Sequence, residues 1–75
     1  MSARPVKRSL TLKGHRTSVS LEDDFWHAFR EISEIKSIPI NALAAEIDAK
    51  RDLETGLATA IRLYVLAYYK NRAHP

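Results

Sequence analysis

Residues 15–21, His-Arg-Thr-Ser-Val-Ser-Leu, alternate in polarity, and this alternation limits the possible folds more than any other feature of the chain. Alternation of this kind is typical of a β-strand that buries one of its faces. One face would carry Thr17, Val19 and Leu21, and the opposite face would carry Arg16, Ser18 and Ser20. Because unpaired strand backbone is costly when it is buried, this segment needs a partner strand.

Two kinds of partner satisfy that need. Residues 8–12 also alternate, and the Lys13-Gly14 pair that follows is a turn signal, since glycine accepts a positive φ at little cost. One solution is therefore a hairpin within a single chain. In the other solution, residues 15–21 pair with the same segment of a second chain as an antiparallel ribbon about a two-fold axis. Residues 1–7 are expected to form a flexible basic arm, and residues 8–75 a single domain.

Three helices are predicted after the strand. The first should span about residues 22–37, because Ser20 with an acid three residues later resembles a capping box. Its apolar side chains recur at helical spacing. They are Phe25, Phe29, Ile32 and Ile35.

The second predicted helix begins near Pro39 or Ile40, since proline suits a first helical turn. It should end between Lys50 and Thr55, with Gly56 as a candidate C-cap. The third helix is predicted over residues 57–70. Its apolar residues surround most of its circumference, so it must be covered on more than one side.

The size of the chain favours an oligomer. The chain has 75 residues and no cysteine, which excludes disulfides and thiolate metal sites. A domain of this length buries only about 60% of the surface of its unfolded chain, so its core is marginal. A second copy of the chain is the simplest remaining source of core, and we expect a homodimer.

The basic residues concentrate at the N-terminus. Residues 1–16 contain five Lys and Arg and no acid, whereas the remainder contains seven basic and nine acidic residues. A basic arm on a mildly acidic body indicates an anionic partner, although a solvated tail would give the same pattern.

The order of these elements resembles the ribbon-helix-helix family of DNA-binding proteins. The stretch "RTSVSLEDDFWHAFREISEIKSIPINALAAEI" is similar to the family pattern from end to end. The pieces "HRTSVSLE", "FW" and "LATAIRLYVL" resemble a bacterial branch of the family that carries a third, C-terminal helix. The resemblance covers about residues 8–70. It implies a mainly α fold with one short β-strand, built as an intertwined homodimer with a two-stranded antiparallel ribbon and an extra helix.

The resemblance also implies a role for individual residues. The base-reading positions of the family fall on Arg16, Ser18 and Ser20. Contacts with DNA phosphates are expected from Lys7, Arg8, Lys13, His15, Ile40 and Asn41. The dimer core is expected to contain Thr17, Val19, Leu21, Phe25, Phe29, Ile32, Leu43, Ile47, Ile61 and Val65. One departure is Ser37-Ile38-Pro39, where the family commonly has G-x-S/T, and Pro39 supplies neither an N–H group nor a side-chain oxygen.

The predicted function is therefore sequence-specific binding of double-stranded DNA by a homodimer, typical of a transcriptional repressor. The alternative is a protein-interaction module, such as an antitoxin or adaptor, that binds a protein partner through its helical body, above all its C-terminal helix. Binding of DNA without sequence preference is a third reading.

Other chemistry is not indicated. The three histidines, His15, His27 and His74, do not have the spacing of metal ligands. The sequence also contains no catalytic constellation and no glycine-rich phosphate loop. We therefore expect no metal, no cofactor and no enzyme activity. The longest apolar run is too short for a membrane span and no secretory signal is visible, so we expect a cytoplasmic protein without membrane contact.

Overall fold

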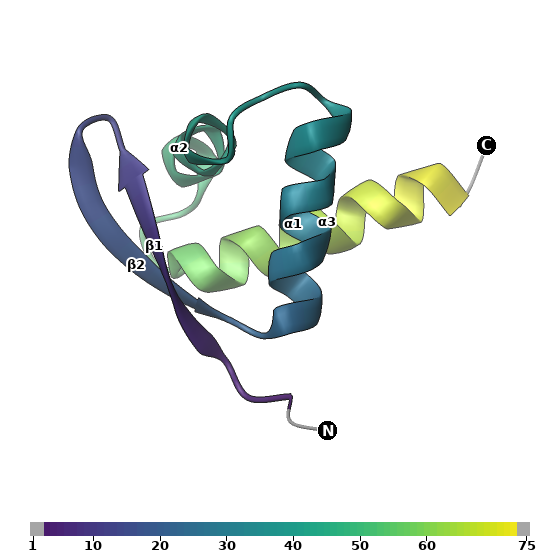
Figure 1. The fold of residues 1–75 in the computed structure, drawn as a ribbon, viewed down its shortest axis with the longest axis horizontal. Helices are drawn as coiled ribbons and strands as arrows, with labels where there is room; N and C mark the ends of the chain where they lie inside the picture. Colours follow the sequence, from purple (N-terminus) through teal and green to yellow (C-terminus); the bar gives the residue numbers. More distant parts are fainter. Residues whose placement is uncertain (1–2, 74–75) are drawn as a thin grey trace.

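The computed structural model describes residues 3–73 and begins with a β-hairpin formed within one chain (Figure 1). Strand β1 (Val6–Leu12) pairs antiparallel with β2 (His15–Leu21), from Val6 opposite Leu21 to Leu12 opposite His15. The two residues between the strands have φ values of 52° and 84°. A two-residue turn with two positive φ angles has type I′ geometry, which matches the twist of the strands it joins. The hairpin alternative is therefore confirmed, and the protomer contains two strands rather than one.

The prediction of a flexible arm over residues 1–7 is wrong for its last two residues. Val6 and Lys7 belong to β1, because Leu21 and Ser20 of β2 supply them with pairing partners. Residues 1 and 2 lie outside the described part of the chain.

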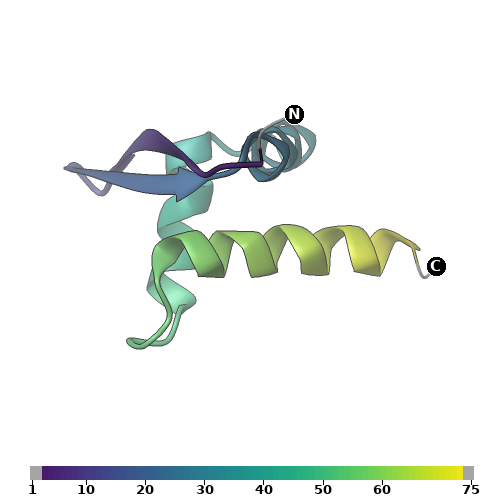
Figure 2. The same cartoon turned by 90° about the horizontal axis from the view of Figure 1, so that it is seen from below.

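Three helices follow the hairpin, as predicted. Helix α1 spans Asp23–Ile35, α2 spans Ile40–Lys50 and α3 spans Leu57–Ala73. Helix α3 is three residues longer than the predicted 57–70. It runs beneath the hairpin and α1, so the hairpin and α1 form one layer and α3 forms the other, with α2 reaching from one to the other beside the hairpin (Figures 1 and 2). The two-stranded antiparallel ribbon and the additional C-terminal helix are thus present, with both ribbon strands supplied by one chain.

The start of α1 differs from the capping box that the sequence predicted. Ser20 pairs with Lys7 in the strand ladder and lies two residues before the N-cap position, so its side chain is not placed to cap the helix. The N-cap residue is Glu22, which makes no side-chain cap hydrogen bond. Asp23 and Asp24 occupy the first turn, where their charges favour the positive end of the helix dipole.

The predicted C-cap at Gly56 is also wrong. Helix α2 ends at Lys50, within the predicted range, and its C-cap is Arg51, whose backbone is extended and whose guanidinium donates to the carbonyl of Thr55 at 2.8 Å. This bond organises the connecting segment, and it leaves Gly56 at the beginning of α3. There the Gly56 carbonyl accepts a hydrogen bond from the N–H of Ala60 at 3.0 Å.

The core lies between the inner face of the hairpin and the three helices. Eight of the ten residues expected in the dimer core are buried within the single chain: Val19, Leu21, Phe29, Ile32, Leu43, Ile47, Ile61 and Val65. They form the core of the protomer, because its own hairpin closes over its helices. Phe25 is only half-buried, and Thr17 is exposed, contrary to the prediction that both lie in the core.

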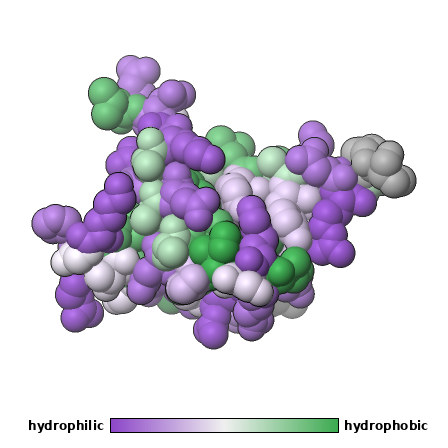
Figure 3. Space-filling view, turned by 90° about the horizontal axis from the view of Figure 1, so that it is seen from above, coloured by the Kyte–Doolittle hydropathy of each residue, from purple (hydrophilic) through white to green (hydrophobic). Residues whose placement is uncertain are grey.

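Hydrophobic side chains that remain exposed are dispersed. The face in Figure 3 is mostly hydrophilic, with hydrophobic residues in small groups. On α3, Leu63 and Leu66 keep 56% and 53% of their surface exposed, so the chain does not fully cover a helix that is apolar on most sides. Ile35 at the end of α1 and Leu53 in the α2–α3 connection are also exposed.

Candidate nucleic-acid interface

The outer face of the hairpin is entirely polar and contains no acid. Its six side chains are exposed and come from alternate positions of the two strands: Lys7, Ser9, Thr11, Arg16, Ser18 and Ser20. The strand register places Arg16 opposite Thr11 and Ser18 opposite Ser9. The predicted placement of Arg16, Ser18 and Ser20 on one exposed face is confirmed, whereas their contact with bases stays a prediction.

Sequence reasoning missed Ser9 and Thr11 as members of this face. A signal for them was present, because a two-residue turn fixes the register of a hairpin. With Lys13 and Gly14 as the turn, each odd-numbered residue of β1 must share a face with an even-numbered residue of β2. The outer face is therefore a two-stranded surface of four hydroxyl groups and two cations within one chain.

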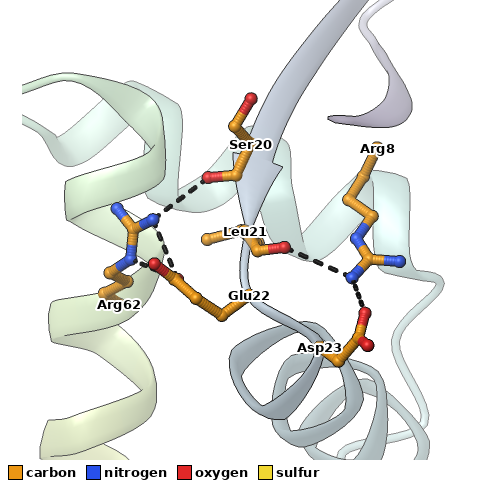
Figure 4. Close-up of polar contacts among 6 residues, drawn as sticks. All are labelled: Arg8, Ser20, Leu21, Glu22, Asp23 and Arg62. Carbon is orange, nitrogen blue, oxygen red and sulfur yellow. Dashed lines mark hydrogen bonds and ion pairs between the residues drawn. The ribbon is translucent and has the colours of Figure 1, made fainter. Parts of the chain in front are cut away.

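Arg8 does not lie on the outer face, and its predicted contact with DNA phosphate stays a prediction that this placement does not favour. Its side chain points inward, is only 16% exposed and pairs with the carboxylate of Asp23. The guanidinium also donates to the carbonyl of Leu21 at 3.2 Å (Figure 4). It lies 5.4 Å from the ring centre of Trp26. Arg8 therefore joins β1 to the start of α1, because the odd–even alternation of β1 directs it toward the helices.

Arg62 of α3 approaches the same junction from the opposite side of β2 (Figure 4). It donates to the carboxylate of Glu22 at 2.9 Å and to the carbonyl of Ser20 at 3.2 Å. Its guanidinium also lies 5.8 Å from the ring centre of Phe25. Sequence reasoning did not assign Arg62 a role, because its partners are about forty residues away along the chain.

The charge of Glu22 is stabilised by this arrangement. Hydrogen bonding to backbone lowers the pKa of Glu22 below its usual range, and the hydrogen bond from Arg62 acts in the same direction. Glu22 is therefore an anion that holds α3 against the strand–helix junction. We refer to Arg8, Asp23, Glu22 and Arg62 together as the junction clamp, since they fix the hairpin on the helices from both sides.

The tip of the hairpin lies next to the start of α2. The backbone N–H of Thr11 donates to Oδ1 of Asn41 at 3.0 Å, which ties the end of β1 to the first turn of α2. Lys13 and His15 are exposed at the same end of the hairpin. The structure thus brings together four of the predicted phosphate contacts, Lys13, His15, Ile40 and Asn41, at one end of the outer face, while Lys7 lies toward the other end.

A groove of about 440 Å³ lies between α2 and α3, away from this face. Its lining includes the apolar side chains of Leu43, Ile47 and Leu63 together with Lys36 and Tyr64. The ammonium of Lys36 donates to the hydroxyl of Tyr64 at 2.9 Å, and this bond raises the pKa of Lys36.

Further along α3, the hydroxyl of Tyr69 donates to the carboxylate of Glu31 on α1. That hydrogen bond, with some burial, raises the pKa of Tyr69 to about 12. Helix α3 is therefore attached to the rest of the chain by polar bonds at several points along its length.

Comparison with known proteins agrees with the architecture. A family profile for the ribbon-helix-helix domain matches residues 5–69, which include both strands, α1, α2 and most of α3. No curated protein and no solved structure matches the chain significantly. Within residues 3–73, none of the helices is long and apolar enough to cross a membrane.

Proposed function

Because this chain belongs to the ribbon-helix-helix domain family, whose members are generally DNA-binding regulators, we propose that it is a homodimeric, sequence-specific DNA-binding protein that regulates transcription. The observation that carries the proposal is the outer face of the hairpin, where an exposed arginine and three serines share a surface with Lys7 and Thr11 and with no acid.

The hairpin has the shape that the major groove of B-DNA admits. A two-stranded ribbon fits a groove about 12 Å wide, and its outer side chains then face the base edges. Arg16 is suited to donate two hydrogen bonds to O6 and N7 of a guanine, while the hydroxyls of Ser18 and Ser20 can donate or accept. Arg16 therefore supplies the strongest base preference, and the serines accept a wider range of bases.

Phosphate contacts hold the ribbon in the groove. We assign them to Lys7, Lys13 and His15, which are exposed near the margins of the outer face, and to the peptide N–H groups of Ile40 and Asn41 at the start of α2. Arg8 is left out, because its guanidinium is engaged by Asp23 and Leu21.

The experiment that tests this function compares two exposed arginines. Arg16→Ala should weaken binding to a specific duplex by about 1–3 kcal/mol, or about 5- to 150-fold. The matched control is Arg30→Ala, on an exposed position of α1, which should leave affinity close to the wild-type value. Affinity of the wild-type protein should also fall steeply with salt concentration, because phosphate contacts release counterions.

The outcomes separate the alternatives. Equal losses at Arg16 and Arg30 would contradict base reading by the hairpin. Strong salt dependence without any preference among duplex sequences would indicate general, nucleoid-type binding instead.

A protein-interaction module is the second candidate, and the groove between α2 and α3 favours it. Apolar side chains form part of the groove's lining, and one of them, Leu63, is more than half exposed. If the biological activity of the protein is insensitive to Arg16→Ala but is lost in Leu63→Asp, the protein acts through this groove rather than through DNA.

A further inference from the structure

The groove between α2 and α3 has the size and the lining of a small-molecule site. Its volume of about 440 Å³ lies within the range of ligand pockets, which is roughly 300–1,000 Å³. Both helices contribute apolar side chains to it, Leu43 and Ile47 from α2 and Ala60 and Leu63 from α3. Leu63 keeps 56% of its surface exposed, so an apolar occupant would remove hydrophobic surface from water.

Lys36 and Tyr64 place polar groups in the same groove. Lys36 is the C-cap residue of α1, and Tyr64 belongs to α3. Nζ of Lys36 donates to the hydroxyl oxygen of Tyr64 at 2.9 Å and lies 5.5 Å from the centre of its ring. This bond uses the Tyr64 oxygen as an acceptor and only one of the three protons on the Lys36 ammonium.

The hydroxyl proton of Tyr64 is therefore left to donate to another group. Within residues 3–73, no oxygen accepts it. Lys36 keeps two further N–H donors and stays a cation, since the bond to Tyr64 raises the pKa of Lys36. Two adjacent donors, one of them charged, are complementary to the two oxygens of a carboxylate.

The charges around the groove also favour an anion. In the described part of the chain, its lining has one more cation than carboxylate: Lys36, Lys50 and Arg51 against Glu46 and Asp52. Glu46 lies near enough to raise the pKa of Lys36 but forms no ion pair with it, so the donors of Lys36 stay available. Arg51 is already engaged, because its guanidinium donates to Asp48 at 2.7 Å and to the carbonyl of Thr55 at 2.8 Å.

We propose that this groove binds a small monocarboxylate with an apolar body, whose carboxylate accepts hydrogen bonds from Nζ of Lys36 and from the hydroxyl of Tyr64. The apolar body lies against Ile47 and Leu63. The part of α2 that lines the groove, residues 43–50, is about 10 Å long. That length suits an acid with one aromatic ring or a comparable aliphatic chain. The site lies away from the outer face of the hairpin, so it adds a second ligand and does not depend on the proposed function.

A simple aromatic acid and its neutral analogue test the site. The probe is 4-phenylbutyrate, and the analogue is 4-phenylbutanamide, which has the same body without the charge. Methyl NMR spectra of the full chain report the position of the ring, because an aromatic ring shifts the resonances of methyl groups beside it. The acid should shift Ile47 and Leu63 in a saturable way, with a Kd of roughly 1 mM, and should leave Val19 beneath the hairpin unchanged. The amide should bind at least about ten-fold more weakly.

Two variants test the donors separately. Tyr64→Phe removes the hydroxyl and keeps the ring, and Lys36→Met removes the ammonium and keeps an unbranched stem. Each should weaken binding of 4-phenylbutyrate by roughly ten-fold. The matched control is Lys70→Met, an exposed cation of α3 outside the groove, which should keep the wild-type affinity.

Each outcome has a definite meaning. Equal affinities for the acid and the amide would overturn recognition of the carboxylate. Shifts at Val19 in place of Ile47 and Leu63, or no saturable shift at ten times the expected Kd, would overturn the site. Equal losses in Lys36→Met and Lys70→Met would show that the acid responds only to net charge. If a variant does not retain the thermal transition of the wild-type protein, the comparison of acid and amide on the wild-type protein still decides.

The two proposals fail separately. Arg16→Ala, on the outer face of the hairpin, should leave the affinity for 4-phenylbutyrate unchanged. Specific DNA binding by a protein that does not bind the acid contradicts only the groove site, whereas binding of the acid without binding of DNA contradicts only the proposed function.

Discussion

Lys7 and Arg8 are adjacent cations on opposite faces of β1, and replacing each with alanine should separate stability from DNA binding. Arg8→Ala removes a charge-assisted hydrogen bond to the Leu21 carbonyl, which contributes about 1.5 kcal/mol to the free energy of unfolding. It removes an ion pair with the exposed Asp23, which contributes about 0.5 kcal/mol. It also removes a contact of the guanidinium with Trp26, which contributes about 0.5 kcal/mol, and two partly buried methylenes, which contribute about 1 kcal/mol together.

One term opposes these losses. Nε of Arg8 is buried without a hydrogen-bond partner among the described residues, and removing it relieves about 1 kcal/mol. Arg8→Ala should therefore lower the free energy of unfolding by about 2–3 kcal/mol, which lowers the melting temperature of a domain of this size by roughly 10–20 °C. Lys7→Ala, at an exposed position, should change the stability by less than about 0.5 kcal/mol.

The DNA measurement should give the opposite ranking. Affinity for a fixed duplex is measured at several salt concentrations and at a temperature where both variants are folded. Lys7→Ala should reduce the slope of log K against log salt by about 1, and Arg8→Ala should leave that slope unchanged. A variant Arg8→Ala that melts like the wild-type protein and loses one unit of slope would show that Arg8 contacts phosphate after all, and would refute its place in the junction clamp.

Further predictions concern the turn, the core and the pH dependence. Gly14→Ala should lower stability by about 1 kcal/mol in chemical denaturation, because φ at this position is +84° although no atom obstructs a Cβ there. Phe29→Ala should cost about 3–5 kcal/mol in the same assay, since Phe29 is fully buried; a smaller loss would contradict the position of the core. Tyr69 should ionise near pH 12 by ultraviolet absorbance, and Glu31→Gln should move that transition toward 10. Because the pKa of Tyr69 is raised on folding, this bond stabilises the protein below about pH 10 and its contribution is lost as the pH rises through 12.

The outer face was largely predictable from the sequence. Alternation in residues 15–21 places Arg16, Ser18 and Ser20 together whatever strand they pair with. The same reasoning, applied through the two-residue turn, would have added Ser9 and Thr11, because a hairpin turn fixes which residues of the two strands share a face.

The roles of Arg8 and Arg62 were not predictable in this way. Arg8 carries the positive charge of a phosphate ligand, but its partners belong to β2 and α1. These partners come close only because of how the hairpin packs on the helices. Arg62 meets Glu22 and Ser20 only after α3 has folded back beneath β2. Tertiary packing, which local sequence patterns do not encode, decides whether each of these charges is available to a partner.

The exposure of Thr17 shows the same limit of sequence-based prediction. Alternation assigns its side chain to the inner face, and the structure agrees, but exposure depends on whether a helix lies beneath that position. The protomer provides such cover for Val19 and Leu21 and not for Thr17.

Selection from random duplexes tests the central claim, that the outer face of the hairpin reads DNA sequence. Purified wild-type protein and the Arg16→Ala variant are each taken through the same selection, and the enriched duplexes are sequenced. The wild-type protein should enrich an inverted repeat with a guanine in each half-site, and Arg16→Ala should lose the preference at those guanines while keeping the spacing of the half-sites. Failure of the wild-type protein to enrich any sequence, or an identical consensus from the two proteins, would contradict the claim.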